Sequence, residues 1–179
     1  MPTPTYVAIA KTVLTGTQST VTISSIPQTY TDLLVVTSVR FTYPSVYTTW
    51  LTMRLNNDSS SSVYSANYIL AQGSSVSSSR FASGAINRAY PYYTDGDLST
   101  TNTFGSGEFY IPNYTSTSLS KIISATGVSE TNDTTNNIIL PSANLYTGSS
   151  AISSIVFTVV GATGMDSGSR FDLYGIKNS

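Results

Sequence analysis

Short segments in which apolar and polar residues alternate run along the whole chain, separated by turns rich in Ser, Thr, Gly and Asn. Alternation with a period of two is typical of β-strands, because successive side chains point to opposite faces of a sheet. Residues 32–41 form the strongest case, with Leu33 and Val35 on one face and Leu34 and Val36 on the other. A strand that is apolar on both faces is typical of the middle of a sheet.

The pattern predicts an all-β fold, an antiparallel β-sandwich of jelly-roll type with about ten strands. No segment keeps the i, i+3, i+4 apolar spacing of an amphipathic helix, so we expect no long helix. Pro141 suggests an edge strand or a bulge, since proline cannot donate to a strand ladder. Turn residues predict loops at 73–79 and 93–103. Besides 32–41, the expected strands are 6–14, 21–26, 50–55, 63–72, 80–90, 104–111, 119–128, 138–145, 152–160 and 170–176.

One domain accounts for the chain, because 179 residues suffice for one hydrophobic core. Pro2 and Pro4 favour an extended entry. We therefore expect an N-terminal arm over 1–10 and a single β-sandwich domain over 11–179. The arm could lie along a neighbouring subunit.

The absence of histidine and cysteine excludes several kinds of chemistry. A Ser–His–Asp triad, a Cys/His zinc site and a disulfide scaffold all need these residues. Most of the acidic residues lie in expected turns, and Asp95-Gly96-Asp97 is read as a turn because it lacks the further acids of a calcium loop. Glu108 is the exception, since it lies in an expected strand, where an outward-facing residue is the simpler interpretation. We predict no catalytic residue, no metal site and no cofactor, although a carbohydrate-active enzyme that uses Glu108 stays an alternative.

The chain carries little charge, with a formal net charge of −1 and 9% charged residues. A nucleic-acid partner is not expected, because phosphate binding needs clustered Lys and Arg. The weak net repulsion favours self-association. No run of 18 apolar residues is present, so we expect no membrane partner, and the start lacks the features of a signal peptide.

Aromatic residues are the best candidates for contact sites, because tyrosine combines a large apolar face with a hydroxyl group. Two clusters occur, one with Tyr43, Tyr47 and Trp50 and one within the Tyr90–Tyr93 segment. The alternatives are rings of the sandwich core, subunit contacts and glycan contacts. The candidate residues for contact with a subunit or the capsid are Tyr6, Tyr43, Tyr47, Trp50, Tyr90, Tyr92 and Tyr93.

Three segments resemble a family of small β-rich proteins of tailed bacteriophages, notably phages of marine bacteria and cyanobacteria. They are VTISSIPQTYTDL at 21–33, FYIPNY at 109–114 and FDLYGIKN at 171–178. The resemblance implies a virion structural protein. Capsid decoration proteins and fibre head domains are both often trimers and both use jelly-roll-like sandwiches. No catalytic residue comes with the family.

These observations lead us to expect a capsid decoration (cement) protein, made in the bacterial cytoplasm and located in the virion. It would form a homotrimer and bind the major capsid protein or another virion protein, with 1–10 and the Tyr90–Tyr93 loop as contacts. The alternative is a tail-fibre or tail-tip domain that recognises a host surface glycan.

Overall fold

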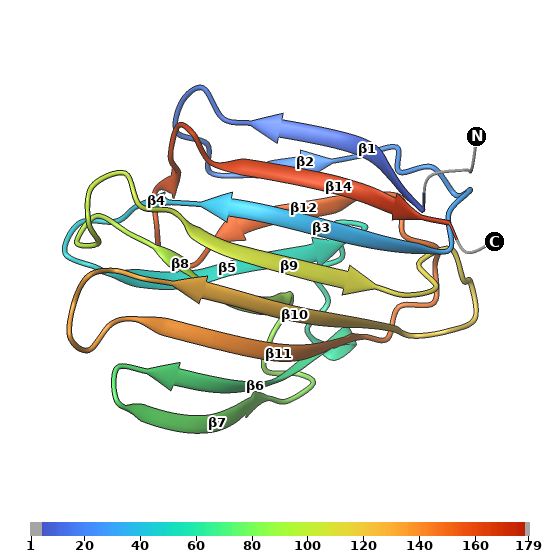
Figure 1. The fold of residues 1–179 in the computed structure, drawn as a ribbon. Helices are drawn as coiled ribbons and strands as arrows, with labels where there is room; N and C mark the ends of the chain where they lie inside the picture. Colours follow the sequence, from blue (N-terminus) through green and yellow to red (C-terminus); the bar gives the residue numbers. More distant parts are fainter. Residues whose placement is uncertain (1–4, 178–179) are drawn as a thin grey trace.

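The computed structural model describes residues 5–177 and confirms the antiparallel β-sandwich, with fourteen strands in this range instead of about ten. Two sheets pack face to face (Figure 1). Apart from a three-residue 3-10 turn, the described residues form no helix, and none could cross a membrane. The strands are β1 (Tyr6–Val13), β2 (Val21–Ile23), β3 (Asp32–Val39), β4 (Phe41–Thr42), β5 (Thr48–Leu55), β6 (Tyr64–Gln72), β7 (Ser75–Phe81), β8 (Ala89–Asp95), β9 (Gly105–Ile111), β10 (Lys121–Ser129), β11 (Ile138–Tyr146), β12 (Ile155–Val159), β13 (Gly164–Met165) and β14 (Arg170–Ile176).

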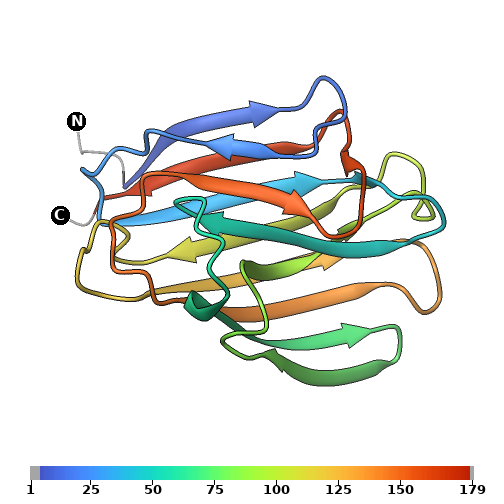
Figure 2. The ribbon, with the colours of Figure 1, turned by 180° about the vertical axis from the view of Figure 1, so that it is seen from behind.

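The larger sheet has eight strands in the order β1-β14-β3-β9-β10-β11-β6-β7. The smaller sheet has the order β2-β12-β5-β8 and lies in front when the molecule is seen from behind (Figure 2). All strand pairs within the two sheets are antiparallel. The central position expected for 32–41 is confirmed, since β3 lies between β14 and β9.

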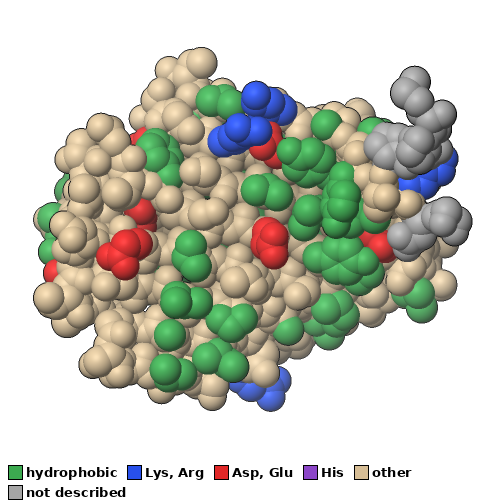
Figure 3. Space-filling view, viewed as in Figure 1, with side chains coloured by type: hydrophobic (Ala, Val, Ile, Leu, Met, Phe, Trp, Pro, Cys, Tyr) green, Lys and Arg blue, Asp and Glu red, His purple; other side chains and the backbone are tan. Residues whose placement is uncertain are grey.

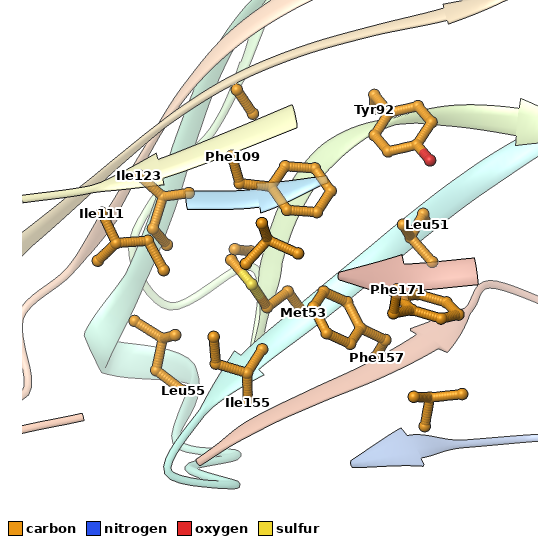
Figure 4. Close-up of a cluster of buried hydrophobic side chains, with 14 of the residues drawn as sticks. Leu51, Met53, Leu55, Tyr92, Phe109, Ile111, Ile123, Ile155, Phe157 and Phe171 are labelled. Atoms are coloured by element: carbon orange, nitrogen blue, oxygen red, sulfur yellow. The ribbon is translucent and has the colours of Figure 1, made fainter. Parts of the chain in front are cut away.

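The core fills the space between the sheets and follows from the alternation in the sequence. Every second residue of β9, β10 and β12 is buried. Facing strands supply fully buried side chains such as Met53, Phe109 and Phe157 (Figure 4). Burial of a large apolar side chain contributes roughly 1.5–3 kcal/mol, so this inner layer is the main source of stability.

A buried lysine closes one end of the sandwich. The Lys121 side chain is 1% exposed, and its Nζ donates hydrogen bonds to the carbonyl oxygens of Ser116, Ser149 and Ser150 at 2.7–3.0 Å. Burial lowers the pKa of this ammonium group. The cation therefore ties the β9–β10 and β11–β12 connections together through neutral acceptors.

Four expectations for individual segments are wrong. The strand expected at 80–90 is mostly the connection between β7 and β8. The Ser-rich loop expected at 73–79 is mostly strand β7, which pairs with β6 without a register shift. The expected Tyr90–Tyr93 loop lies inside β8. Pro141 lies in β11, which is an interior strand, and the pairing with β6 skips Leu140 and Pro141, so the missing N–H falls in a gap of the ladder.

The expected N-terminal arm is only partly described. Residues 6–10 are extended, but they belong to β1 and pair with β14, with a bulge between Ala8 and Ala10. Their backbone groups bond to this chain's own C-terminal strand, so they do not form a free arm. The rest of the arm, 1–4, lies outside the described residues.

Candidate interaction surface

Apolar side chains are exposed on the outer face of the eight-stranded sheet (Figure 3). Val76 of β7 lies opposite Ala71 of β6. On the other side of β6, Ile139 of β11 lies opposite Ala71, and Val128 of β10 lies opposite Ile139. The exposed fractions of Val76, Ile139 and Val128 are 74%, 58% and 43%. We call these four residues the apolar row.

One shallow hollow lies on the apolar row and another lies beside it. The first, of about 280 Å³, is lined by Ala71, Val128 and Ile139 of the row together with Gly73 and Glu130. A wider hollow beside it, of about 480 Å³, lies over β6, β7, β10 and β11, at the gap in the β6–β11 pairing. Exposed apolar groups next to hollows offer a partner both hydrophobic area and shape.

A second apolar area lies on the same face, over β9, β3, β14 and β1. Tyr110, Leu34 and Tyr174 are neighbours in one register row. The Tyr110 hydroxyl donates a hydrogen bond to Asp32 Oδ2 at 2.7 Å. This hydrogen bond, with burial as a second cause, raises the pKa of Tyr110 to about 12.

Charged groups on this face are few and partly paired. Glu108 is exposed and outward-facing, in agreement with the simpler interpretation of the sequence. Asp172 is 5% exposed, and its Oδ2 accepts a hydrogen bond from Arg170 Nε at 2.5 Å, while its Oδ1 has no partner among the described residues. Lys11 lies opposite Asp172 in the next strand. The apolar row itself contains no charge.

Five aromatic rings form a separate cluster where the two sheets meet beside β8. The Trp50 ring lies 4.2 Å from Tyr93, 5.1 Å from Tyr68, 5.5 Å from Tyr90 and 5.9 Å from Phe81 (centroid distances). Trp50 is buried and the other four rings are half-buried. Burial raises the pKa of Tyr93. The expected contact residues Trp50, Tyr90 and Tyr93 thus come together, although they stabilise the sandwich edge through ring contacts.

Tyr92 belongs to the core, and its assignment as a contact residue is wrong. Its side chain is fully buried, and its hydroxyl shares a 2.8 Å hydrogen bond with Thr37 Oγ1. Burial raises the pKa of this hydroxyl. The ring fits against the larger sheet because Gly107 and Gly127, which are direct partners in β9 and β10, have no side chains.

The remaining expected contact residues lie apart from the aromatic cluster. Tyr6 is 56% exposed at the start of β1, on the edge of the larger sheet. Tyr43 and Tyr47 lie in the β4–β5 connection, where Tyr43 is exposed and Tyr47 is half-buried. Their role in contacts stays a prediction.

The two acidic residues of the Asp95-Gly96-Asp97 turn differ in burial. Asp95 ends β8, is 1% exposed and accepts a hydrogen bond from Ser129, whereas Asp97 is exposed. Burial raises the pKa of Asp95. Residues 5–177 contain no group of three or more acidic side chains placed to hold a metal ion.

Sequence reasoning missed the apolar row. Its members come from four strands whose order in the sheet cannot be read along the chain. The available signal was the presence of Val128 and Ile139 on the exposed side of their strands' alternation. Val76 gave no such signal, because β7 does not alternate.

Comparison with known proteins gives no family. No family model and no curated protein matches the chain. Among solved structures, exo-inulinase from Aspergillus awamori is similar with 13% identity and a TM-score of 0.39, over 97% of this chain and 29% of that chain. The exoplasmic/lumenal domain of VIP36, in a Ca²⁺/Man3GlcNAc-bound form, is similar with 9% identity and a TM-score of 0.31, over 100% of this chain and 84% of that chain. Likenesses of this strength carry no functional argument.

Proposed function

We propose that this chain is a structural protein of a tailed-phage virion, a capsid decoration protein that docks through the outer face of its larger sheet. The apolar row is the observation that carries the proposal, because Val76, Ile139 and Val128 expose side chains that the fold itself does not use. The sequence resemblance supplies the expected partner, the major capsid protein or another virion protein. The proposal assigns no reaction to the chain.

Docking would remove the apolar row from water and so hold adjacent capsid subunits together. Apolar area contributes roughly 25 cal/mol per Å² when it is buried, although ordering and polar desolvation offset part of this gain. Few charged groups surround the row, so the interface needs few ion pairs, and its strength is expected to depend weakly on salt.

The test is the reconstitution of stripped capsids with purified protein. Ile139→Lys places a charge in the middle of the row and is expected to lower the number of copies bound per particle at least tenfold. The matched control is Thr22→Lys, an exposed strand residue of the smaller sheet. Equal binding by Ile139→Lys and the control would refute docking through this face. Stripped capsids that resist heat and osmotic shock as well as intact ones would refute the stabilising role.

A second candidate function is recognition of a host surface glycan, as part of a tail fibre or tail tip. The aromatic cluster favours it, since the half-buried rings of Tyr68, Tyr90 and Tyr93 carry hydroxyl groups beside apolar faces that a sugar ring could cover. The chain's single tryptophan, Trp50, lies in this cluster. Binding of a host polysaccharide is therefore expected to shift its fluorescence. A glycan array without binders and an unchanged Trp50 spectrum would exclude this candidate.

A further inference from the structure

Strand β7 ends the larger sheet with an edge to which another strand could be added. We propose that a second copy of this chain occupies that edge, with the two β7 strands paired antiparallel about Ser78. The pairing uses the backbone edge of the sheet, and Val76 is the one residue that β7 shares with the apolar row.

The backbone of β7 is regular and accessible. All seven of its residues pair with β6, from Ala66 with Phe81 to Gln72 with Ser75, without a register shift. Six of the seven are exposed. In an antiparallel ladder, alternate residues direct their N–H and C=O groups away from the existing partner. Within 5–177, no other strand pairs with that side of β7.

The other long edges of the sandwich carry features that oppose strand addition. The opposite edge strand of the larger sheet, β1, has a bulge between Ala8 and Ala10 and an exposed lysine, Lys11. In the smaller sheet, β2 has only three residues, and β8 contains Pro91 beside a register irregularity in its pairing with β5. Short strands, bulges, lysine and proline are the usual protection of sheet edges. Strand β7 is seven residues long and has no bulge, lysine or proline, and its one charged side chain is Arg80, next to its last residue.

The β7 sequence suits self-pairing in one register. With Ser78 opposite its own copy, Ser77 lies opposite Ser79, and Val76 lies opposite Arg80. The strand's only charge is that of Arg80, so this register places no like charges opposite each other. The aliphatic part of Arg80 can cover Val76, and the small serine side chains do not obstruct the approach of the two backbones. The net charge of −1 adds little repulsion between copies.

This pairing is two-fold, and so it predicts a dimer in place of the trimer expected from the sequence. A two-fold axis between antiparallel strands is perpendicular to the sheet. Both outer faces then point the same way, and the two eight-stranded sheets become one continuous sheet.

The test uses the absence of cysteine from the chain. Ser78→Cys places one thiol on the axis, and we expect oxidation to produce a disulfide-linked dimer. Ser77→Cys alone should stay uncrosslinked, whereas a mixture of Ser77→Cys and Ser79→Cys should form the mixed dimer. The control is Ser106→Cys, an exposed residue of the interior strand β9, which should stay monomeric on oxidation. Absence of the Ser78→Cys crosslink, or equal crosslinking at every position, would overturn the proposal.

Light scattering gives the second measurement. The wild-type chain should have twice the mass of the 19.1 kDa monomer at high concentration. Ser78→Lys, which brings two lysines together on the axis, should weaken the dimer at least tenfold without changing the unfolding midpoint of dilute protein. The control is Ser124→Lys on the interior strand β10, which should still dimerise. A monomer, a trimer, or a dimer unaffected by Ser78→Lys would refute pairing through β7.

Discussion

The packing of Tyr92 against paired glycines allows a sharp test of how the two sheets recognise each other. Tyr92 of β8 lies over Gly107 and Gly127, which face each other in β9 and β10. A Cβ atom added at Gly107 would lie 2.7 Å from Cδ1 of the ring. At Gly127 it would overlap Cβ and Cγ, the atoms of Tyr92 nearest to its backbone. The ring cannot rotate away from such an overlap, so we expect Gly127→Ala to be strongly destabilising.

The magnitude follows from two opposing effects. Overpacking a well-packed core costs about 1–3 kcal/mol and occasionally more. Replacing glycine by alanine in a strand returns about 0.5–1 kcal/mol, because alanine loses less conformational freedom on folding. The overlap at Gly127 is severe, so its cost is expected at the upper end of the overpacking range, and the net loss in the free energy of unfolding is expected to be about 2 kcal/mol. For a chain of this size that corresponds to roughly 4–8 °C in Tm.

Urea unfolding followed by the fluorescence of Trp50 provides the assay, since the chain has one tryptophan and no cysteine. The control is Gly16→Ala, because a Cβ at Gly16 would meet nothing within 4 Å. Tyr92→Ala should itself cost about 3–5 kcal/mol by leaving a cavity. In that background Gly127→Ala should be neutral or stabilising, because its methyl group enters the cavity. Additive effects of Tyr92→Ala and Gly127→Ala would refute the reasoning.

Three further predictions concern stability. Lys121→Met removes the ammonium group that donates hydrogen bonds to three carbonyl oxygens. In urea titrations it is expected to lower the free energy of unfolding by about 2–3 kcal/mol. An unchanged free energy would contradict the structural role of this lysine. Ile139→Lys on the exposed apolar row should change stability by less than about 0.5 kcal/mol, which calorimetry can check, so that any loss of docking is separate from unfolding. The pKa values of Tyr110 and Tyr146 are raised to about 12 in the folded chain, so between pH 10 and 12 the unfolded chain loses protons that the folded chain keeps. The free energy of unfolding, measured in urea at a series of pH values, should be constant up to about pH 10 and fall as pH rises to 12. The fall should be less steep for Tyr146→Phe.

The fold could be predicted wherever one face of a strand is buried. The strands expected at 104–111 and 119–128 occur within one or two residues as β9 and β10, because burial of every second residue leaves a clear alternation. Strand β7 could not be predicted in this way. Its two faces are both exposed, so nothing selects apolar residues, and a run of serine reads as a loop although its backbone pairs fully with β6.

The candidate site was less predictable because it depends on sheet order and on packing across the sandwich. Tyr92 can be buried because Gly107 and Gly127, 15 and 35 residues further along the chain, leave room for its ring. The sequence near Tyr92 does not indicate which distant residues it will contact. The segment around it is as rich in tyrosine as an interface would be. Tyr92 can be told apart from the half-buried Tyr90 and Tyr93 only when the register that pairs Gly107 with Gly127 is known.

The two proposed contacts reinforce each other in one assembly. Pairing through β7 would bring two apolar rows onto one surface, because Val76, the first member of the row, lies in the pairing strand itself. Once one row of a dimer is docked, the second meets its own site at an effective concentration in the millimolar range for a short connection, without any new contact. The dimer can therefore stay bound to a capsid of repeating subunits even if each apolar row alone binds weakly. Ser78→Lys, which leaves the row intact, should therefore weaken binding to capsids more than binding to an isolated capsid subunit.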